Sequence, residues 1–403
     1  MREIAFSSNA TKLKPSAICE AIKTGLRPDV ISFAVGNPAP ETFPVEQLRQ
    51  CYDHVLSQEW NVALQYSASE GYPPLREFIA SWMKQQGVSV SADNVLITSG
   101  STQALDLVLR VLLDPGSQVV VDDPLYGGTL HTLSASGVEY LPVRSDPTTG
   151  IDVSGVEDVL RHHTPKLIYT VPNFHNPLGS TIPAEQRPRL AAMSGASGVP
   201  LLEDDPYRTL YFDDTPPPQP IKSFDNSGTV IYLGSFSKVL APGIRLGWLI
   251  ASGDVLDRLI MMKQATDMMT SGLTQMVAYE FCRRGWLEPQ LERSRARYQQ
   301  RRDVTIEAME KHFPPGVRWS VPKGGMFLWV TLPDGCDTEA LLPKAITGGV
   351  VYLPGAAFSV RRNEKGCSAC QNSLRLNFSN AVLETIPEGI ARLGRVLKML
   401  PEE

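Results

Sequence analysis

The residues around Lys238 carry the densest chemistry in the chain. Its amine follows Ser237 by one residue and Ser235 by three, and it precedes Arg245 by seven. An amine can form a Schiff base with an aldehyde, while hydroxyls beside a guanidinium can hold a phosphate. Pyridoxal phosphate needs both, so this stretch predicts a site for that cofactor.

The same letters have a rival interpretation. Ser235-Phe236-Ser237-Lys238 also fits the S-x-x-K of penicillin-binding proteins and β-lactamases, in which a K-T-G motif follows the nucleophile. Here Lys23-Thr24-Gly25 precedes the serine instead. The order of the two motifs argues against a serine acylase.

Composition excludes several broad classes. At 403 residues the chain can bury one large core or two domains, and 42% hydrophobic with 20% charged residues is typical of a globular protein. The net charge of −5 gives no general attraction to nucleic acid or to an acidic membrane. No apolar run approaches a membrane span and no hydrophobic signal segment follows Met1, so we expect a cytoplasmic protein without nucleic-acid or membrane partners.

The cysteines predict no metal site. Only Cys367 and Cys370 form a C-x-x-C, and no second pair or histidine cluster completes a zinc site. We expect a loop with two free thiols there, and a redox or metal role stays as the alternative.

The chain alternates strand-like and helix-like segments between about residues 95 and 251, which is typical of an α/β fold with a mostly parallel sheet. The expected strands are Val95–Thr98, Gln118–Val121, Lys166–Val171, Val199–Leu202, Val230–Leu233 and Leu246–Ala251. After Gly253 the chain becomes more helical, and its C-terminal part mixes strands with helices. We therefore expect a large domain at 46–285 and a smaller α+β domain built from 1–45 and 286–403.

Two groups of side chains outside the strands have open interpretations. We expect a long helix over Leu287–His312, with a solvated face of arginines at 293, 295, 297, 301 and 302. The methionines at 261, 262, 268 and 269 fit either a packed helix interior or an apolar substrate channel.

Polar residues follow five of the expected strands where those strands end, and ligands of open α/β sheets bind at that edge. After the first strand, Ser99 to Gln103 leads into a helix expected from Ala104 to Leu113, whose start favours a phosphate. The other four segments are Asp123 to Tyr126, Pro172 to Gly179, Glu203 to Tyr207 and Ser235 to Lys238. A single such segment is usually a turn or a helix cap, but five at one edge predict a binding site.

With these motifs, from about Ile31 to Leu397, the chain resembles the fold-type I pyridoxal-phosphate aminotransferases of class I/II. It is most similar to the branch that contains 2-aminoadipate, kynurenine and aromatic amino-acid aminotransferases. The resemblance implies transfer of an α-amino group to a 2-oxo acid by a ping-pong mechanism, with amino acids and 2-oxo acids as substrates.

The resemblance also implies roles around the cofactor ring. Lys238 would hold the cofactor as an internal aldimine and then act as general acid and base. Asp204 would face the pyridine nitrogen and keep it protonated. Tyr207 and Asn176 would hydrogen-bond the phenolic oxygen of the ring, and Tyr126 would stack on it.

Further roles concern the phosphate and the substrate. Arg375 would grip the α-carboxylate of the substrate, with Asn176 and the backbone of Gly36 nearby. Tyr66 would reach the phosphate of a neighbouring subunit, which implies a homodimer with shared active sites, and an ordinary core aromatic is the equal alternative. The phosphate itself would be held by Ser101, Thr102, Ser235, Ser237 and Arg245.

The chain departs from the family pattern near the substrate. It has Gly36-Asn37-Pro38 where related sequences usually have a Gly-Leu-Pro-like turn, and His175-Asn176-Pro177-Leu178-Gly179 where they favour Gln-Asn-Pro-Thr-Gly. We expect aromatic, branched or aminoadipate-like donors. Another pyridoxal reaction (oxidation, elimination or decarboxylation) would use the same residues, and a cofactor-binding transcription regulator is a more distant alternative.

Overall fold

The computed structural model describes residues 4–7, 10–11, 27–362 and 366–399. Lys23-Thr24-Gly25 of the rival motif and much of the expected segment 1–45 lie outside this range. Within it, the strands form one eight-stranded, one four-stranded and one two-stranded sheet.

The eight-stranded sheet gives the chain an α/β fold. Its order is β2-β9-β8-β7-β6-β3-β4-β5; the five strands from β8 to β4 run parallel, while β2 and β5 pair antiparallel with their neighbours and β9 runs against both β2 and β8. The strands are β2 (Val95–Thr98), β3 (Gln118–Asp123), β4 (Glu139–Asp146), β5 (Gly150–Ile151), β6 (Leu167–Thr170), β7 (Leu201–Asp204), β8 (Val230–Ser235) and β9 (Gly247–Ile250). The six strands expected from the sequence all form, within a few residues of their expected bounds. The strands β4 and β5 were not expected.

Alternate residues of these strands face opposite layers of helices. Leu202 and Leu233 pack on one side with helices α6 and α10, while their neighbours Leu201 and Val230 pack on the other side with α8 and α9. Burial of each such side chain stabilises the fold by about 1.5–3 kcal/mol. The helices of this part are α3 (Val45–Gln58), α4 (Trp60–Ala63), α5 (Pro73–Gln85), α6 (Ser101–Leu112), α7 (Gly127–Ser136), α8 (Val153–His162), α9 (Arg187–Ser197), α10 (Gly253–Thr266) and α11 (Gly272–Arg283).

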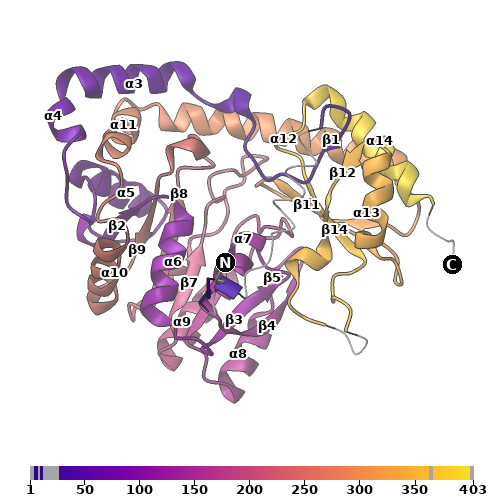
Figure 1. Cartoon of the computed structure of the whole chain (residues 1–403), viewed down its shortest axis with the longest axis horizontal. Coiled ribbons are helices and arrows are strands. Elements are labelled where there is room, and N and C mark those ends of the chain that lie inside the picture. The colour runs from indigo at the N-terminus through magenta and orange to yellow at the C-terminus, as the bar shows by residue number, and fades with distance from the viewer. Residues whose placement is uncertain (1–3, 8–9, 12–26, 363–365, 400–403) are drawn as a thin grey trace.

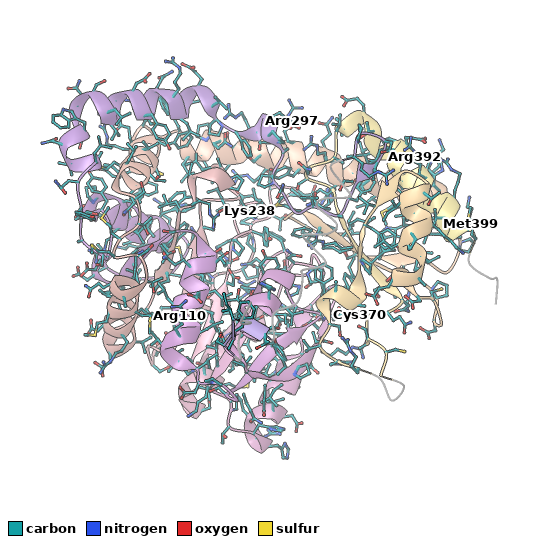
Figure 2. The ribbon with its side chains drawn as sticks, viewed as in Figure 1. Arg110, Lys238, Arg297, Cys370, Arg392 and Met399 are labelled. Carbon is teal, nitrogen blue, oxygen red and sulfur yellow. The ribbon has the colours of Figure 1, made fainter. Side chains whose placement is uncertain are left out.

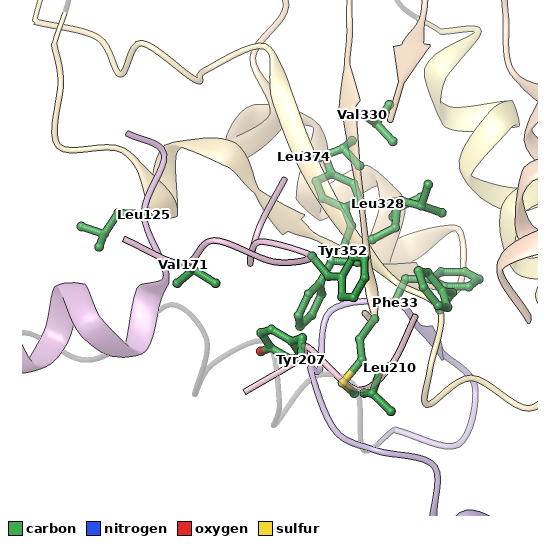
Figure 3. Packing of buried hydrophobic residues seen from close by; sticks show 14 of the residues in the cluster. Phe33, Leu125, Val171, Tyr207, Leu210, Leu328, Val330, Tyr352 and Leu374 are labelled. Atoms are coloured by element: carbon green, nitrogen blue, oxygen red, sulfur yellow. The ribbon is translucent and has the colours of Figure 1, made fainter. Parts of the chain in front are cut away.

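The four-stranded sheet is antiparallel and lies beside the larger one, at the right of Figure 1. Its apolar residues, such as Leu328 and Leu374, join the same core cluster as Leu202, so one core runs through both parts (Figure 3). The remaining elements are β10 (Arg318–Trp319), β11 (Phe327–Thr331), β13 (Leu353–Pro354), β14 (Ser373–Asn377), the parallel pair β1 (Ile31–Ser32) and β12 (Val350–Val351), and the helices α13 (Thr338–Thr347) and α14 (Ile386–Leu397).

The helix α12 (Leu287–His312) has the bounds expected from the sequence and runs along the top of both parts in Figure 1. The expectation of a solvated arginine face is wrong for two of its residues. Arg301 is buried and bonds Glu41 and the carbonyl of Ser379, while Arg302 pairs with Asp213 at 3.0 Å. The long aliphatic stems of these arginines let their charged heads reach partners across the fold.

The residue ranges of the two larger sheets, 95–250 and 318–377, support our proposal of a large domain at 46–285 and a smaller one from both ends of the chain. None of the helices in the described part of the chain has the length and apolar composition that crossing a bilayer requires. No group of three or more histidine, cysteine or acidic side chains suited to a metal ion occurs among the described residues.

Candidate active site

Lys238 lies just beyond the end of β8, near the middle of the molecule (Figure 2). Its side chain is partly buried, and Nζ donates a hydrogen bond to the carbonyl oxygen of Gly36 at 3.1 Å. Gly36 follows β1, so residues 202 positions apart in the chain meet here. This contact places the amine beside the backbone of Gly36, whose role near the substrate's carboxylate stays a prediction.

The surroundings of Lys238 favour its neutral form. Burial, followed by the positive charges of Arg375 and Arg245, lowers the pKa of this amine to about 8. Since only a neutral amine attacks an aldehyde, a lowered pKa makes Lys238 a better nucleophile near neutral pH.

Asp204 is the last residue of β7 and is only 6% exposed. Its Oδ2 accepts a hydrogen bond from Tyr169 Oη at 2.8 Å, whereas its Oδ1 has no partner among the described residues. Burial raises the pKa of this carboxyl to about 7, against the opposing effect of the Tyr169 bond. A buried carboxylate oxygen without a donor is costly, so Oδ1 is suited to a donor that the described residues do not supply.

A chain of hydrogen bonds links Tyr207, Asn176 and Arg375. Asn176 donates through Nδ2 to Tyr207 Oη at 3.4 Å and accepts through Oδ1 from Arg375 Nη1 at 2.9 Å. The ring of Tyr207 meets that of Phe327 edge to face at 5.7 Å, and Figure 3 shows Tyr207 beside the apolar core. Asn176 is therefore held between a phenol and a guanidinium.

Arg375 lies in the central part of β14 and is 2% exposed. Its guanidinium lies over the rings of Phe327 and Phe358 at 4.5 and 5.0 Å, and it donates to the carbonyl of Ala34. Burial lowers its pKa to about 10, and its Nε has no hydrogen-bond partner among the described residues. No carboxylate of the described chain pairs with it, so the site presents a buried cation suited to an anionic ligand.

The residues expected at the phosphate converge at the start of α6. That helix begins at Ser101 rather than at Ala104, because Gly100 has a φ of 87° and turns the chain directly into the first helical residue. Arg245 Nη2 lies close to the Ser99 carbonyl at 3.4 Å, and a Cβ built on Gly100 would approach this Nη2 to 2.6 Å. The arginine thus crosses the backbone at the helix start, beside Ser101 and Thr102.

Two serines at the end of β8 border the same place. Ser235 pairs with Gly247 on β9, and a Cβ on Gly247 would lie 2.8 Å from the backbone nitrogen of Ser101. The backbone N–H of Ser237 donates to Ser235 Oγ at 3.1 Å. Hydroxyls, a guanidinium and a helix start together can hold a phosphate.

Tyr126 directly precedes α7 and is partly buried. Burial raises the pKa of its phenol, and the charges that act on it next are those of Asp204, Arg375 and Arg245. These three charged groups therefore act on the phenol electrostatically, and its stacking on the cofactor ring stays a prediction.

Tyr66 does not join the other site residues within one chain. It is 77% exposed, so the alternative that it is a core aromatic is wrong. Of the four methionines, Met261 and Met268 are 55% and 53% exposed, so a packed helix interior is wrong for these two, whereas Met262 is partly buried against the core. Met269 Sδ accepts from the backbone N–H of Ser67 at 2.9 Å, so the two segments are in contact.

Some site residues were not anticipated from the sequence. Tyr169 donates a hydrogen bond to Asp204 and accepts one from Thr129. His175 and Asp122, both buried, contact each other at 3.1 Å next to Asn176. No signal in the sequence pairs Tyr169 with Asp204, because the two lie on different strands. The register pairs Tyr169 of β6 with Leu202 of β7, and this places Asp204 on the same face two residues later.

In the C-x-x-C segment, the side chain of Cys370 is partly buried. Burial raises the pKa of the Cys370 thiol to about 12, which keeps it protonated and unreactive at neutral pH. Residues 363–365 of this loop lie outside the described part of the chain.

Comparisons with known proteins cover nearly the whole chain. Residues 28–393 match the family model described as aminotransferase class I and II. The chain is 40% identical to a 2-aminoadipate transaminase of Thermus thermophilus, over 98% of this chain and 97% of that protein. It is 39% identical to aromatic-amino-acid aminotransferase 1 of Thermococcus litoralis, over 98% and 94%. A kynurenine aminotransferase of Pyrococcus horikoshii, solved in complex with PMP, matches with a TM-score of 0.92 at 39% identity, over 98% and 96% of the two chains.

Proposed function

The chain belongs to the class I and II aminotransferases, and from this premise we propose that it moves the α-amino group of an amino acid to a 2-oxo acid in two half-reactions of a ping-pong mechanism. Enzymes of this family use pyridoxal 5'-phosphate. The observation that carries the proposal is the pair formed by Lys238, an amine with a lowered pKa, and Asp204, whose buried Oδ1 lacks a donor.

The residues fit the cofactor. Asp204 Oδ1, which has no donor among the described residues, would accept from the N–H of a pyridinium ring, and the positive charge of that ring would lower the raised pKa of this carboxyl. Lys238 would bind the aldehyde covalently. Tyr126 would stack on the ring, Tyr207 and Asn176 would hydrogen-bond its phenolic oxygen, and the phosphate would be held by Ser101, Thr102, Ser235, Ser237 and Arg245.

When bound, the cofactor supplies an electron sink for the pair left on the substrate's Cα. The residues of the chain supply the rest. Lys238 Nζ, displaced by the amine of the substrate, would accept the Cα proton and move it during the transfer. Asp204 would keep the ring nitrogen protonated. The lowered pKa of Lys238 suits its amine to both accept and donate a proton near neutral pH.

Arg375 would hold the α-carboxylate of the substrate. A planar guanidinium binds a carboxylate with two parallel hydrogen bonds, which orients the neighbouring Cα as a single ammonium could not. The bond from Nη1 to Asn176 Oδ1 limits how the guanidinium can turn. Its bond to the Ala34 carbonyl lies two residues before the Gly36 carbonyl that accepts from Lys238. We propose aromatic, branched or aminoadipate-like amino acids as donors, and the names of two relatives support the aromatic and aminoadipate classes.

We further propose a homodimer with shared sites. The alternate residues Trp60, Val62, Leu64 and Tyr66 are all exposed in the single chain, and so are Met261 and Met268. A run of large apolar side chains on one surface segment is typical of a protein interface. Tyr66 of one subunit would then reach the phosphate in the site of its partner.

A chemical trapping experiment tests the site. After addition of pyridoxal phosphate, reduction with borohydride and peptide mapping should find the adduct on the peptide that contains Lys238. Lys238→Ala should stay colourless, whereas replacement of the exposed Lys166 by alanine should leave the adduct unchanged. An adduct on another lysine would refute the assignment.

A product assay tests the reaction type. A panel of amino acids with 2-oxoglutarate should yield one glutamate for each donor consumed. Release of ammonia or carbon dioxide in place of glutamate would instead identify an oxidation, elimination or decarboxylation on the same cofactor.

A further inference from the structure

Two buried polar residues outside the proposed chemistry, Tyr169 and Thr129, contact the site from behind Asp204. Tyr169 lies in β6 and Thr129 in the first turn of α7, and neither side chain is exposed. A hydroxyl in a dry core costs free energy unless it is hydrogen-bonded, so both side chains must have partners. Their partners are each other and Asp204.

The two hydroxyls form a relay with one direction. Thr129 Oγ1 donates to Tyr169 Oη at 2.8 Å, and Tyr169 Oη donates to Asp204 Oδ2 at 2.8 Å. A phenol has a single hydrogen. Because Tyr169 accepts from Thr129, its own hydrogen remains for Asp204, and Oδ1 is left as the free oxygen of that carboxylate.

The fold holds this relay rigidly. In the register of β6 and β7, Tyr169 pairs with Leu202, so Asp204 lies two residues further along the same face. The helix α7 packs on that face and starts immediately after Tyr126. One short helix therefore carries both the residue proposed to stack on the ring and the hydroxyl that orients Tyr169.

The hydrogen bond from Tyr169 also affects the ionisation of Asp204. Burial is the largest influence on the Asp204 carboxyl and raises its pKa to about 7, while the bond from Tyr169 lowers it. Without this bond the carboxyl would hold its proton more strongly. A protonated Asp204 could not balance a positive charge at the ring nitrogen.

We propose that Tyr169 and Thr129 are positioning residues that orient and ionise Asp204 for the ring nitrogen of the cofactor. The inference rests on the proposed function, since it assumes that pyridoxal phosphate occupies this site. Neither residue touches the cofactor itself. Both act through the carboxylate.

The test compares the dissociation constant of pyridoxal phosphate between variants, followed by the absorbance of the bound cofactor. Tyr169→Phe should weaken binding by about tenfold or more, because it removes a hydrogen bond to a charged group. Thr129→Val should weaken it in the same direction by less, and Thr129→Ser, which keeps the hydroxyl, should match the wild type. The pH at which the absorbance of the bound cofactor changes should also differ between Tyr169→Phe and the wild type.

A second background separates positioning from simple packing. In Asp204→Asn, the further change Tyr169→Phe should have no additional effect on cofactor binding, because there is no carboxylate left to orient. The same loss in both backgrounds, or unchanged binding in Tyr169→Phe, would overturn the inference while the proposed function stands. A wild-type chain that takes up no pyridoxal phosphate would overturn the proposed function, and this inference with it.

Discussion

At the scale of single residues, burial moves the pKa of three site residues towards the neutral forms of their side chains. The pKa of Lys238 falls to about 8, that of Asp204 rises to about 7 and that of Arg375 falls to about 10. Arg375 remains a cation at neutral pH, whereas Lys238 and Asp204 are each divided between two forms. Before ligands bind, Lys238 and Asp204 can therefore each gain or lose a proton near neutral pH.

The lowered pKa of Lys238 predicts how cofactor capture depends on pH. Below pH 8 the neutral fraction of this amine grows about tenfold for each pH unit, and above pH 8 it levels off. The rate of aldehyde capture by the cofactor-free protein, followed by stopped-flow absorbance, should rise and then level in the same way. A rate that keeps rising towards pH 10 would show that Lys238 has the pKa of an ordinary lysine.

Replacing Arg375 tests carboxylate capture. Arg375→Lys keeps the charge but loses the planar pair of donors, so we expect kcat/KM for the amino acid to fall by about 10- to 100-fold, mostly through KM. Cofactor binding should change little. The matched control is Arg297→Lys on the exposed face of α12, which should leave both parameters unchanged.

The chemistry of these residues was predictable from the sequence, but their pairing was not. The spacing of Ser235, Lys238 and Arg245 pointed to the cofactor, because one short segment supplies all three. The lone Oδ1 of Asp204 depends on Tyr169, a residue from another strand, and no local pattern shows which hydroxyl will point at which oxygen.

At the scale of elements, the site lies where strands end and helices begin. The six expected strands were found because they are continuous apolar runs, as buried parallel strands are. The strand β4 was missed because its sequence, Glu139 to Asp146, mixes charged residues with Pro142 and follows no apolar run. The ion pairs of Arg301 and Arg302 were missed for a related reason, since a helical pattern does not show what lies across from it.

The start of α6 packs closely against Gly247 of β9, so we expect a methyl group added at Gly247 to disturb it. A Cβ at Gly247 would lie 2.8 Å from backbone atoms of Gly100 and Ser101, so Gly247→Ala should displace the start of α6. We expect a loss of stability of about 1–3 kcal/mol together with weaker binding of pyridoxal phosphate. Denaturant unfolding and cofactor titration measure the two effects.

The control for this change lies four residues away in the same segment. A Cβ on Gly243 would meet nothing within 4 Å, so Gly243→Ala should leave cofactor affinity unchanged. Equal affinities in the two variants would mean that the start of α6 does not contribute to phosphate binding.

At the scale of the whole molecule, the exposed apolar residues of one segment matter most. Trp60, Val62, Leu64 and Tyr66 expose large apolar surfaces that water solvates poorly. The sequence could not show this, because an exposed apolar segment and a buried one have the same composition. Only the fold reveals that Tyr66 is exposed in the single chain.

Mixed dimers test the shared site. Lys238→Ala and Tyr66→Ala chains, co-expressed with different tags, should form dimers in which about half of the sites have both residues intact. Their activity should exceed the mean of the two parent homodimers. Lys238→Ala paired with Arg375→Ala should give no such gain, because both residues belong to one chain's site. Equal behaviour of the two pairs would contradict the sharing of Tyr66.

The unpartnered oxygen of Asp204 has a consequence for the lifetime of the protein in a cell. A chain made while vitamin B6 is scarce must fold around a carboxylate whose Oδ1 has no donor among the described residues, so it should unfold, and be degraded, more readily. A ligand present at a hundred times its dissociation constant adds about 2.7 kcal/mol to stability. We therefore expect nutrient supply to set the abundance of this chain as well as its catalytic state, which pulse-chase labelling in starved and replete cultures would measure.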